Sequence, residues 1–290
     1  MSSSWADVVG AVEKTVPSDA RAEEVPDSQL WYDAFDRLFH NKRQRRPVKI
    51  STACDGINAP IFALKVLRIM FEHIYGSEPK YTAQRFTAAS GTVAEHHFKD
   101  AEDGANSKGH CIVHNKECSI PMDAEDIHIS GPKCQLYSDL NNERQSDFEA
   151  IKQHDDFSAV KSFVKTLAQR RPRIAIMENV IGMMKKRQGS EKSFLMEIIA
   201  MTEVEAPEYA VVTITGCASK WLPGTRERLY IIFTRAGEGT AMDLANEVQH
   251  FCDRHMEGAI NIRQMTLQDC LPDEAKPLLK RRINEKKATL

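Results

Sequence analysis

Long apolar runs are missing from this sequence, since no stretch approaches the roughly 18 consecutive apolar residues of a membrane-spanning helix. The first residues, MSSSWADVVGAVEK, also lack the basic start and the apolar middle of a secretory signal peptide. The seven cysteines are an odd number at irregular spacing, which argues against a disulfide framework in a chain of 290 residues. These absences predict a protein that lies inside the cell, makes no membrane contact and keeps its thiols reduced.

A strong positive charge is missing as well. The formal net charge is −2, so no overall cationic field indicates a nucleic-acid partner. Positive charge is local and gathers at residues 41–49 (NKRQRRPVK), 185–187 (KKR) and 280–287 (KRRINEKK). Each cluster alone is typical of a solvated surface or a nuclear-import signal. The clusters would bind phosphates only if the fold brought them to one cleft.

The sequence divides into three parts. Residues 1–46 are polar and are interpreted as an N-terminal extension. Residues 47–235 carry regular apolar patterns, and 42% hydrophobic residues in the whole chain are enough to bury a full core. Residues 236–290 contain one predicted helix, AMDLANEVQHFCDRH, and a basic end, which is short for a second domain. We therefore expect one main domain at 47–235.

Strand patterns alternate with helix patterns inside this domain. Helices are predicted over residues 59–76, where apolar spacing continues up to Gly76, over FSAVKSFVKTLAQ, and from Ser190 through SEKSFLMEIIAMT. Strands are predicted at VKISTA, DIHIS, RIAIM, YAVVTIT and RLYIIFT. The alternation predicts an α/β fold, with helices on both faces of a mixed, mostly parallel sheet and ligands beyond the carboxyl ends of its strands.

Groups with useful chemistry follow or border these predicted strands. Three of them are the turn Asp55-Gly56-Ile57, the loop Gly131-Pro132-Lys133-Cys134 and the triplet Glu178-Asn179-Val180, and the fourth is Arg226-Glu227-Arg228, which leads into the last strand. Taken singly, each has a plain structural alternative: a buried thiol, a helix-start carboxylate and surface ion pairs. Taken together, they predict one site with a thiol, a carboxyl group and two guanidinium groups.

These signatures, in this order, resemble those of the C5-cytosine DNA methyltransferases. The resemblance covers about residues 47–235, and IRQMTLQDCL echoes a later family element. It implies a Rossmann-like methyltransferase fold, S-adenosylmethionine as cofactor, DNA as substrate and a nuclear location. It also implies transfer of a methyl group to C5 of cytosine through a covalent cysteine adduct.

The resemblance assigns a role to each residue. Cys134 would add to cytosine C6, Glu178 would hydrogen-bond to or protonate N3, and Asn179 would orient that glutamate. Arg228, with Arg226 beside it, would hold the cytosine O2 and a nearby phosphate of a flipped-out nucleotide. The residues expected to bind the cofactor are Cys54, Asp55, Gly56, Ile57, Ala59 and Lys133, and those expected to contact nucleic acid are Ser138, Lys185, Lys186 and Arg187.

Several positions depart from the family pattern. The second strand should end in an acid that binds the ribose hydroxyls, yet QRFTAASG, aligned there, offers none, which predicts weak cofactor binding. Lys133 replaces a proline, so a cation that would favour a thiolate sits beside the cysteine, and Gly224 replaces a glutamine. A full target-recognition domain is not evident, so another protein would supply recognition. A catalytically weakened homologue that binds nucleic acid or a partner, and a tRNA methyltransferase, are therefore kept as alternatives.

One segment, HCIVHNKEC, offers the metal-ligand types Cys111, His114 and Cys118, with His110 adjacent. Zinc sites usually pair a Cys-x-x-Cys knuckle with a distant second pair, and this spacing differs. The segment is interpreted as a polar loop before the strand that follows Asp126, and no metal is predicted.

Overall fold

The computed structural model describes residues 46–122, 125–138, 148–186, 190–217, 226–235 and 246. The predicted extension at 1–46, apart from Arg46, lies outside the described residues, as do Arg187, Gly224 and the predicted helix at 241–255, apart from Asn246. All described strands fall between Val48 and Arg235. The domain boundaries themselves stay a prediction.

Nine strands form one sheet in the order β5-β4-β3-β2-β1-β6-β7-β9-β8. Strands β1, β2, β3, β6 and β7 run parallel to one another, whereas β9 is antiparallel to both β7 and β8, and β4 and β5 form an antiparallel hairpin at the other edge. The strands are β1 (Val48–Ala53), β2 (Phe71–Ser77), β3 (His96–Phe98), β4 (Lys108–Cys111), β5 (Lys116–Ser119), β6 (Ile127–Ser130), β7 (Ile174–Asn179), β8 (Tyr209–Cys217) and β9 (Glu227–Arg235). The predicted mixed, mostly parallel α/β sheet is confirmed.

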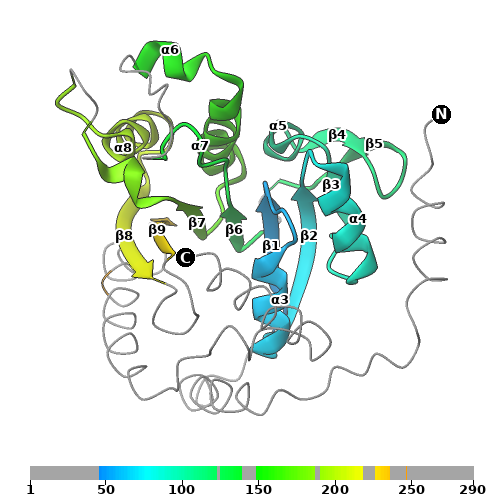
Figure 1. Ribbon diagram of the computed structural model, residues 1–290. Helices are drawn as coiled ribbons and strands as arrows, with labels where there is room; N and C mark the ends of the chain where they lie inside the picture. The colour runs from blue at the N-terminus through cyan, green and yellow to red at the C-terminus, as the bar shows by residue number, and fades with distance from the viewer. Residues whose placement is uncertain are drawn as a thin grey trace, which may run out of the picture.

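Helices cover both faces of this sheet (Figure 1). On one face α3 (Ala59–Val66) and α4 (Tyr81–Ala89) are neighbours, with the rings of Phe62 and Phe86 6.2 Å apart. The other face carries α5 (Ala101–Ala105), α7 (Ser158–Arg170) and α8 (Phe194–Glu205). The remaining pieces are α6 (Phe148–Lys152) and two short 3-10 turns, η1 (Asp155–Phe157) and η2 (Ile181–Met184). Among the helices described, none has the length and apolarity needed to cross a membrane.

The core lies mainly under α7 and α8. Phe157, Val160, Val164 and Leu167 form the predicted apolar face, and all four are buried; Phe157 lies in the turn η1 just before α7. Helix α8 begins at Phe194 rather than at Ser190, because Ser193 caps it by accepting a hydrogen bond from the Met196 N–H at 3.2 Å. The main apolar packing therefore lies behind β6, β7 and β9.

The helix predicted over residues 59–76 is wrong in its second half. Helix α3 ends at Val66, the chain turns through Arg68 at φ 51°, and residues 71–77 form strand β2 beside β1. Phe71 and Ile74 fall at helical spacing from the apolar residues of α3, but both are residues of strand β2; Phe71 pairs with Val48 of β1, and Ile74 lies where the register shifts. Here the pairing of β2 with β1, rather than the helical spacing of the apolar residues, determines the secondary structure. In consequence, QRFTAASG lies in α4 and just after it, not at the end of the second strand.

Candidate active site

The site is built at the carboxyl ends of β1, β2, β6 and β7. The turn after β1 reverses tightly, with Cys54, Gly56 and Asn58 all in the left-handed region at φ 51°, 54° and 62°. The N–H of Gly56 donates to Glu78 Oε2 at 2.8 Å. This bond ties the β1 turn to the residue that follows β2.

Glu78 is the acid that the sequence reading missed. It comes directly after β2 and is 5% exposed. Its second oxygen, Oε1, accepts a hydrogen bond from the Lys80 N–H at 2.8 Å. Two backbone donors thus fix the carboxylate while each oxygen keeps a lone pair for a ligand. The expectation of a second strand without an acid is wrong, and the predicted weakness of cofactor binding loses its basis.

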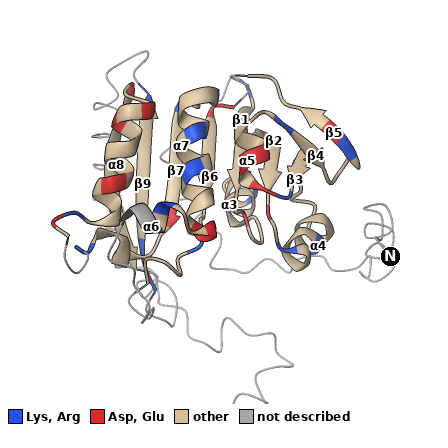
Figure 2. Ribbon diagram, turned by 90° about the horizontal axis from the view of Figure 1, so that it is seen from above, with Lys and Arg blue, Asp and Glu red and all other residues tan. Residues whose placement is uncertain are grey.

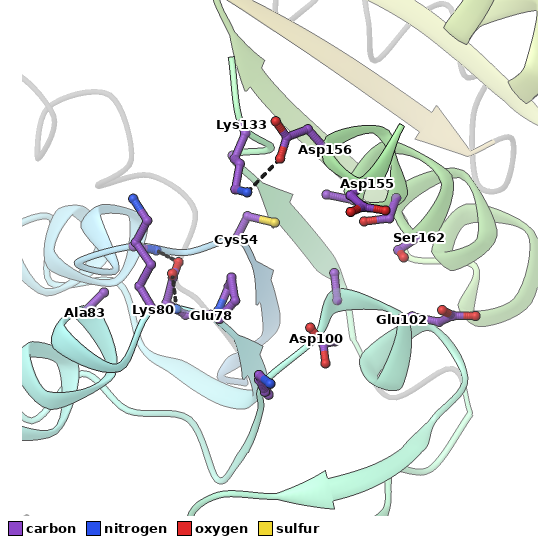
Figure 3. Close-up of a pocket in the computed structure, with 17 residues that line it drawn as sticks. Cys54, Glu78, Lys80, Ala83, Asp100, Glu102, Lys133, Asp155, Asp156 and Ser162 are labelled. Atoms are coloured by element: carbon purple, nitrogen blue, oxygen red, sulfur yellow. Dashed lines mark hydrogen bonds and ion pairs between the residues drawn. The ribbon is translucent and has the colours of Figure 1, made fainter. Parts of the chain in front are cut away.

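A cavity of about 470 Å³ opens beside this carboxylate. Its wall comes from the β1 turn, from the starts of α4, α5 and α7, and from the loop after β6 (Figure 3). The carboxylates on the wall belong to Glu78, Asp100, Glu102, Asp155 and Asp156. A cavity of this size holds a small organic ligand. Three lysines, Lys80, Lys99 and Lys133, also line it, and the five carboxylates outnumber them, so the wall can pair with positive groups of a ligand.

Lys133 also lines the cavity, where its Nζ lies 2.7 Å from Asp156 Oδ1. This hydrogen bond raises the pKa of Lys133 above its usual value. The ammonium charge is therefore engaged by a carboxylate of the wall (Figure 3).

The predicted cofactor residues separate into two groups. Cys54, Gly56 and Lys133 line the cavity. The Asp55 side chain turns inward to accept a hydrogen bond from Thr52 Oγ1 at 2.8 Å, and burial raises the pKa of Asp55 to about 7. Ile57 is exposed, and Ala59 is the first residue of α3. Neither Asp55, Ile57 nor Ala59 lines the described cavity.

Of the two thiols near this edge, only one is available for chemistry. Burial raises the pKa of Cys54 to about 12, which keeps that thiol protonated. Cys134 is exposed, and its carbonyl accepts the N–H groups of Tyr137 and Ser138 at 3.0 and 2.9 Å. A short turn therefore presents the Cys134 side chain to solvent.

Asn179 fixes the loop that carries this thiol. It is 1% exposed and donates from Nδ2 to the Pro132 carbonyl at 3.1 Å, two residues before Cys134. The family resemblance instead implied that Asn179 orients Glu178. The described contacts make Asn179 a support of the Cys134 loop, next to Glu178 in β7.

Glu178 and Arg228 form an ion pair at the same edge. Glu178 Oε1 lies 2.8 Å from Arg228 Nε, on the neighbouring strands β7 and β9. The other oxygen, Oε2, lies 3.9 Å from where a side chain on Gly131 would begin, so the carboxylate lies next to the loop that carries Cys134. Arg226 is exposed just before β9. A thiol loop, a carboxylate and a guanidinium group thus meet where sequence analysis expected them.

The sequence model of the C-5 cytosine-specific DNA methylases matches residues 53–289. The chain belongs to this family. Among curated proteins, the DNA (cytosine-5-)-methyltransferase DMT5 of Cryptococcus neoformans var. grubii serotype A is 24% identical over 199 residues. That stretch covers 65% of this chain but only 8% of the DMT5 protein.

Solved structures of two methyltransferases are similar to 65% of this chain. A putative DNA modification methyltransferase encoded within a prophage (E. coli) has a TM-score of 0.43 at 18% identity and covers 65% of this chain and 47% of that one. Spodoptera frugiperda DNMT2 also has a TM-score of 0.43, at 15% identity, and covers 65% of this chain and 50% of that one. The chain spans about half the length of these structures.

The residues predicted to contact nucleic acid are not gathered as clearly as the catalytic ones. Lys185 and Lys186 are exposed after η2, and Lys186 Nζ lies 2.8 Å from Glu191 Oε2. Ser138 is half-buried at the end of the Cys134 turn. In the view of Figure 2, basic residues on α7 lie beside acidic residues on α8. The assignment of these residues to nucleic acid stays a prediction.

Proposed function

We propose that this family member transfers a methyl group from S-adenosylmethionine to C5 of cytosine in DNA through a covalent adduct of Cys134. The observation that carries the proposal is the position of the exposed Cys134 thiol. It lies on a loop held by Asn179, beside the ion pair of Glu178 and Arg228. A nucleophile, a proton donor and a fixed cation are the groups that addition to a pyrimidine ring requires.

In the proposed reaction the Cys134 thiolate adds to C6 and forms an S–C6 bond. Glu178, as the carboxylic acid, gives its proton to N3, so that no charge accumulates on the ring when the C5=C6 pair shifts towards C5. The remaining donors of Arg228 hold the cytosine O2. S-adenosylmethionine, when bound, supplies an electrophilic methyl group for C5. A solvent-derived base then takes the C5 proton as the S–C6 bond breaks, which restores the C5=C6 double bond and the thiolate of Cys134, and N3 returns its proton to Glu178.

The cavity fits this cofactor. Glu78 offers two oriented acceptors at the end of β2, which suits the vicinal hydroxyls of a ribose. The acidic wall suits the positive sulfonium and amino groups. In this assignment Glu78, Gly56 and Asp100 would hold the cofactor in a cavity that Gly131 and Lys133 of the Cys134 loop also line.

The test is trapping on DNA that contains 5-fluorocytosine, in the presence of S-adenosylmethionine. Fluorine at C5 cannot leave as a proton, so the adduct should accumulate and survive denaturing electrophoresis. Cys134→Ser should abolish the adduct, and Cys217→Ser, which changes a thiol of β8, should retain it.

The other outcomes separate the alternatives. An adduct with 5-fluorocytosine RNA but not with DNA would favour a tRNA methyltransferase. Normal binding of both nucleic acids with no adduct to either would make the chain a weakened homologue that acts as a binding module. A requirement for a second protein would fit the proposal that a partner supplies target recognition.

A further inference from the structure

The segment HCIVHNKEC, predicted to be a polar loop, lies in a β-hairpin formed by β4 and β5, whose buried side carries thiols. Strands β4 and β5 pair from Lys108↔Ser119 to Cys111↔Lys116. Cys111 and Cys118 are both buried, whereas His110 points to the exposed side. The hairpin joins the sheet beside β3, through the pair Phe98↔Cys111. This register brings His96, at the start of β3, to the turn end of the hairpin.

Four side chains converge at this point. His96, Cys111, His114 and Cys118 place one ligand atom each within 4.8 Å of all the others. His114 Nδ1 lies 3.3 Å from Cys111 Sγ and 3.5 Å from Cys118 Sγ, and the rings of His96 and His114 are 4.9 Å apart. In a tetrahedral zinc site, bond lengths of about 2.3 Å to sulfur and 2.0 Å to nitrogen place the two ligand atoms about 3.5 Å apart. The distances from His114 Nδ1 to the two sulfurs, 3.3 and 3.5 Å, are close to that value.

The protein's own hydrogen bonds do not satisfy every group in this cluster, although the two thiols also hydrogen-bond to each other. Both sulfurs approach the same nitrogen, His114 Nδ1, which can accept only one thiol proton. Nδ1 of His96 is buried and has no hydrogen-bond partner among the described residues, while its Nε2 lies 4.0 Å from Glu95 Oε1. Burying a polar group without a hydrogen-bond partner costs free energy. One bound cation would accept lone pairs from all four converging ligand atoms.

We propose that His96, Cys111, His114 and Cys118 bind one zinc ion. Two thiolates balance its charge, and a mixed sulfur and nitrogen set of four favours zinc over harder cations such as magnesium. Four protein ligands leave no open position, so the site is structural rather than catalytic. The ion would link β3 to the hairpin, and thereby support the strand that leads to Asp100 on the cavity wall. The proposal does not depend on methyl transfer.

The first test needs no variant. The full chain, purified from zinc-containing medium and desalted, should carry about one zinc ion for this site by mass spectrometric metal analysis. Replacement by Co²⁺ should give the visible absorption of a tetrahedral site together with sulfur-to-cobalt charge transfer. Full-length protein that carries no zinc and gives no such spectrum with Co²⁺ would overturn the proposal.

The second test assigns the ion to these residues. Cys111→Ser with Cys118→Ser, and separately His96→Ala, should lower the zinc content by one ion per chain, and the charge-transfer band should disappear in the double variant. His110→Ala, on the exposed side of the same hairpin, should retain both signals. Circular dichroism should show that the double variant of Cys111 and Cys118 is folded. If this folded variant keeps its zinc content and its cobalt spectrum, the ion binds elsewhere.

Discussion

The two flanks of the sheet are held together by different interactions. The flank of β6, β7, β9 and β8, under α7 and α8, contains a cluster of nineteen buried apolar residues. The flank of β2, β3, β4 and β5 contains a cluster of six, two of which are Cys111 and Cys118. Apolar burial therefore stabilises the flank that carries Glu178, whereas the flank beside Glu78 has a smaller apolar core and also buries polar groups.

The polar flank has the properties expected of a ligand-binding region. Asp55, His97 and Ser77 have buried polar atoms without a hydrogen-bond partner among the described residues. Such groups cost free energy that apolar packing of the other flank offsets. Ligands that bind only the folded state add to its stability. The cofactor and the proposed zinc ion should therefore stabilise the flank with the smaller core.

Arg170 gives the largest expected effect on stability. It is 0% exposed, at the end of α7, and its Nε donates to Glu125 Oε1 at 2.6 Å. It also donates to the Ser107 hydroxyl and the Pro121 carbonyl, which belong to the polar flank. Arg170→Ala would leave Glu125 buried and unpaired, so it should lower the free energy of unfolding by about 3–5 kcal/mol in urea denaturation.

The matched control is the double variant Arg170→Met with Glu125→Leu, which removes both charges. It should recover most of the loss, because a buried pair can be replaced by apolar residues at little cost. Phe163→Ala in the apolar flank should also cost about 3–5 kcal/mol, by leaving a cavity. A loss below about 1 kcal/mol for Arg170→Ala would contradict the view that this pair joins the flanks.

Glu78 gives the next largest effect, on binding rather than on folding. Glu78→Gln should weaken S-adenosylmethionine binding by about 1.5–3 kcal/mol, or roughly tenfold to a hundredfold, because it removes a charge-assisted hydrogen bond. Titration calorimetry measures the change. Glu72→Gln, an exposed carboxylate on the same strand, is the control and should bind as the wild type does. If Glu78→Gln and Glu72→Gln bind S-adenosylmethionine with equal affinity, Glu78 does not hold the cofactor.

Much of the apolar flank could be predicted from the sequence alone. The strands RIAIM, YAVVTIT and RLYIIFT, the helix FSAVKSFVKTLAQ, and the positions of Cys134 and Glu178 follow short-range patterns that the structure keeps. These segments are long, apolar and bounded by turn residues, so local period and burial agree. The Cys134 turn was found for the same reason, since it directly follows a strand.

The polar flank could not be predicted in the same way. Glu78 was missed because β2 shares its apolar spacing with the preceding helix, and only pairing with β1 separates the two. The signal that could have found it is the acid in GSEP, directly after an aromatic and β-branched run. His96 was missed as a ligand because it lies 15 residues before Cys111 in the sequence, and only the β3–β4 pairing joins them. Contacts set by the sheet, rather than by local spacing, define this flank.

The smallest expected effect is the change of folding stability with pH. It comes from three histidines that lie in the polar flank or next to it. Burial lowers the pKa of His73 and of His97 to about 4, and that of His128 to about 3. The unfolded chain protonates these residues near pH 6.5, so below that value the unfolded state binds more protons and stability falls as pH falls towards 4. Asp55 acts in the opposite direction, because its pKa is raised and its contribution is lost as pH rises through about 7. Because the three histidines lower the stability in acid and only Asp55 raises it, we expect a net loss of stability as the pH falls.

His97 is the residue with which to measure this effect, since both of its nitrogens are buried without a partner among the described residues. Between pH 7 and pH 5 its shifted pKa accounts for at most about 2 kcal/mol of the stability lost. His97→Leu, which is apolar and cannot titrate, should therefore lose less stability than the wild type over this interval. Urea denaturation at both pH values gives the difference, and His110→Ala, exposed on β4, should behave as the wild type does. If His97→Leu and the wild type lose equal stability on acidification, the neutral histidine is not a source of the acid sensitivity, and the contrast between the two flanks would rest on Arg170 and the proposed zinc ligands.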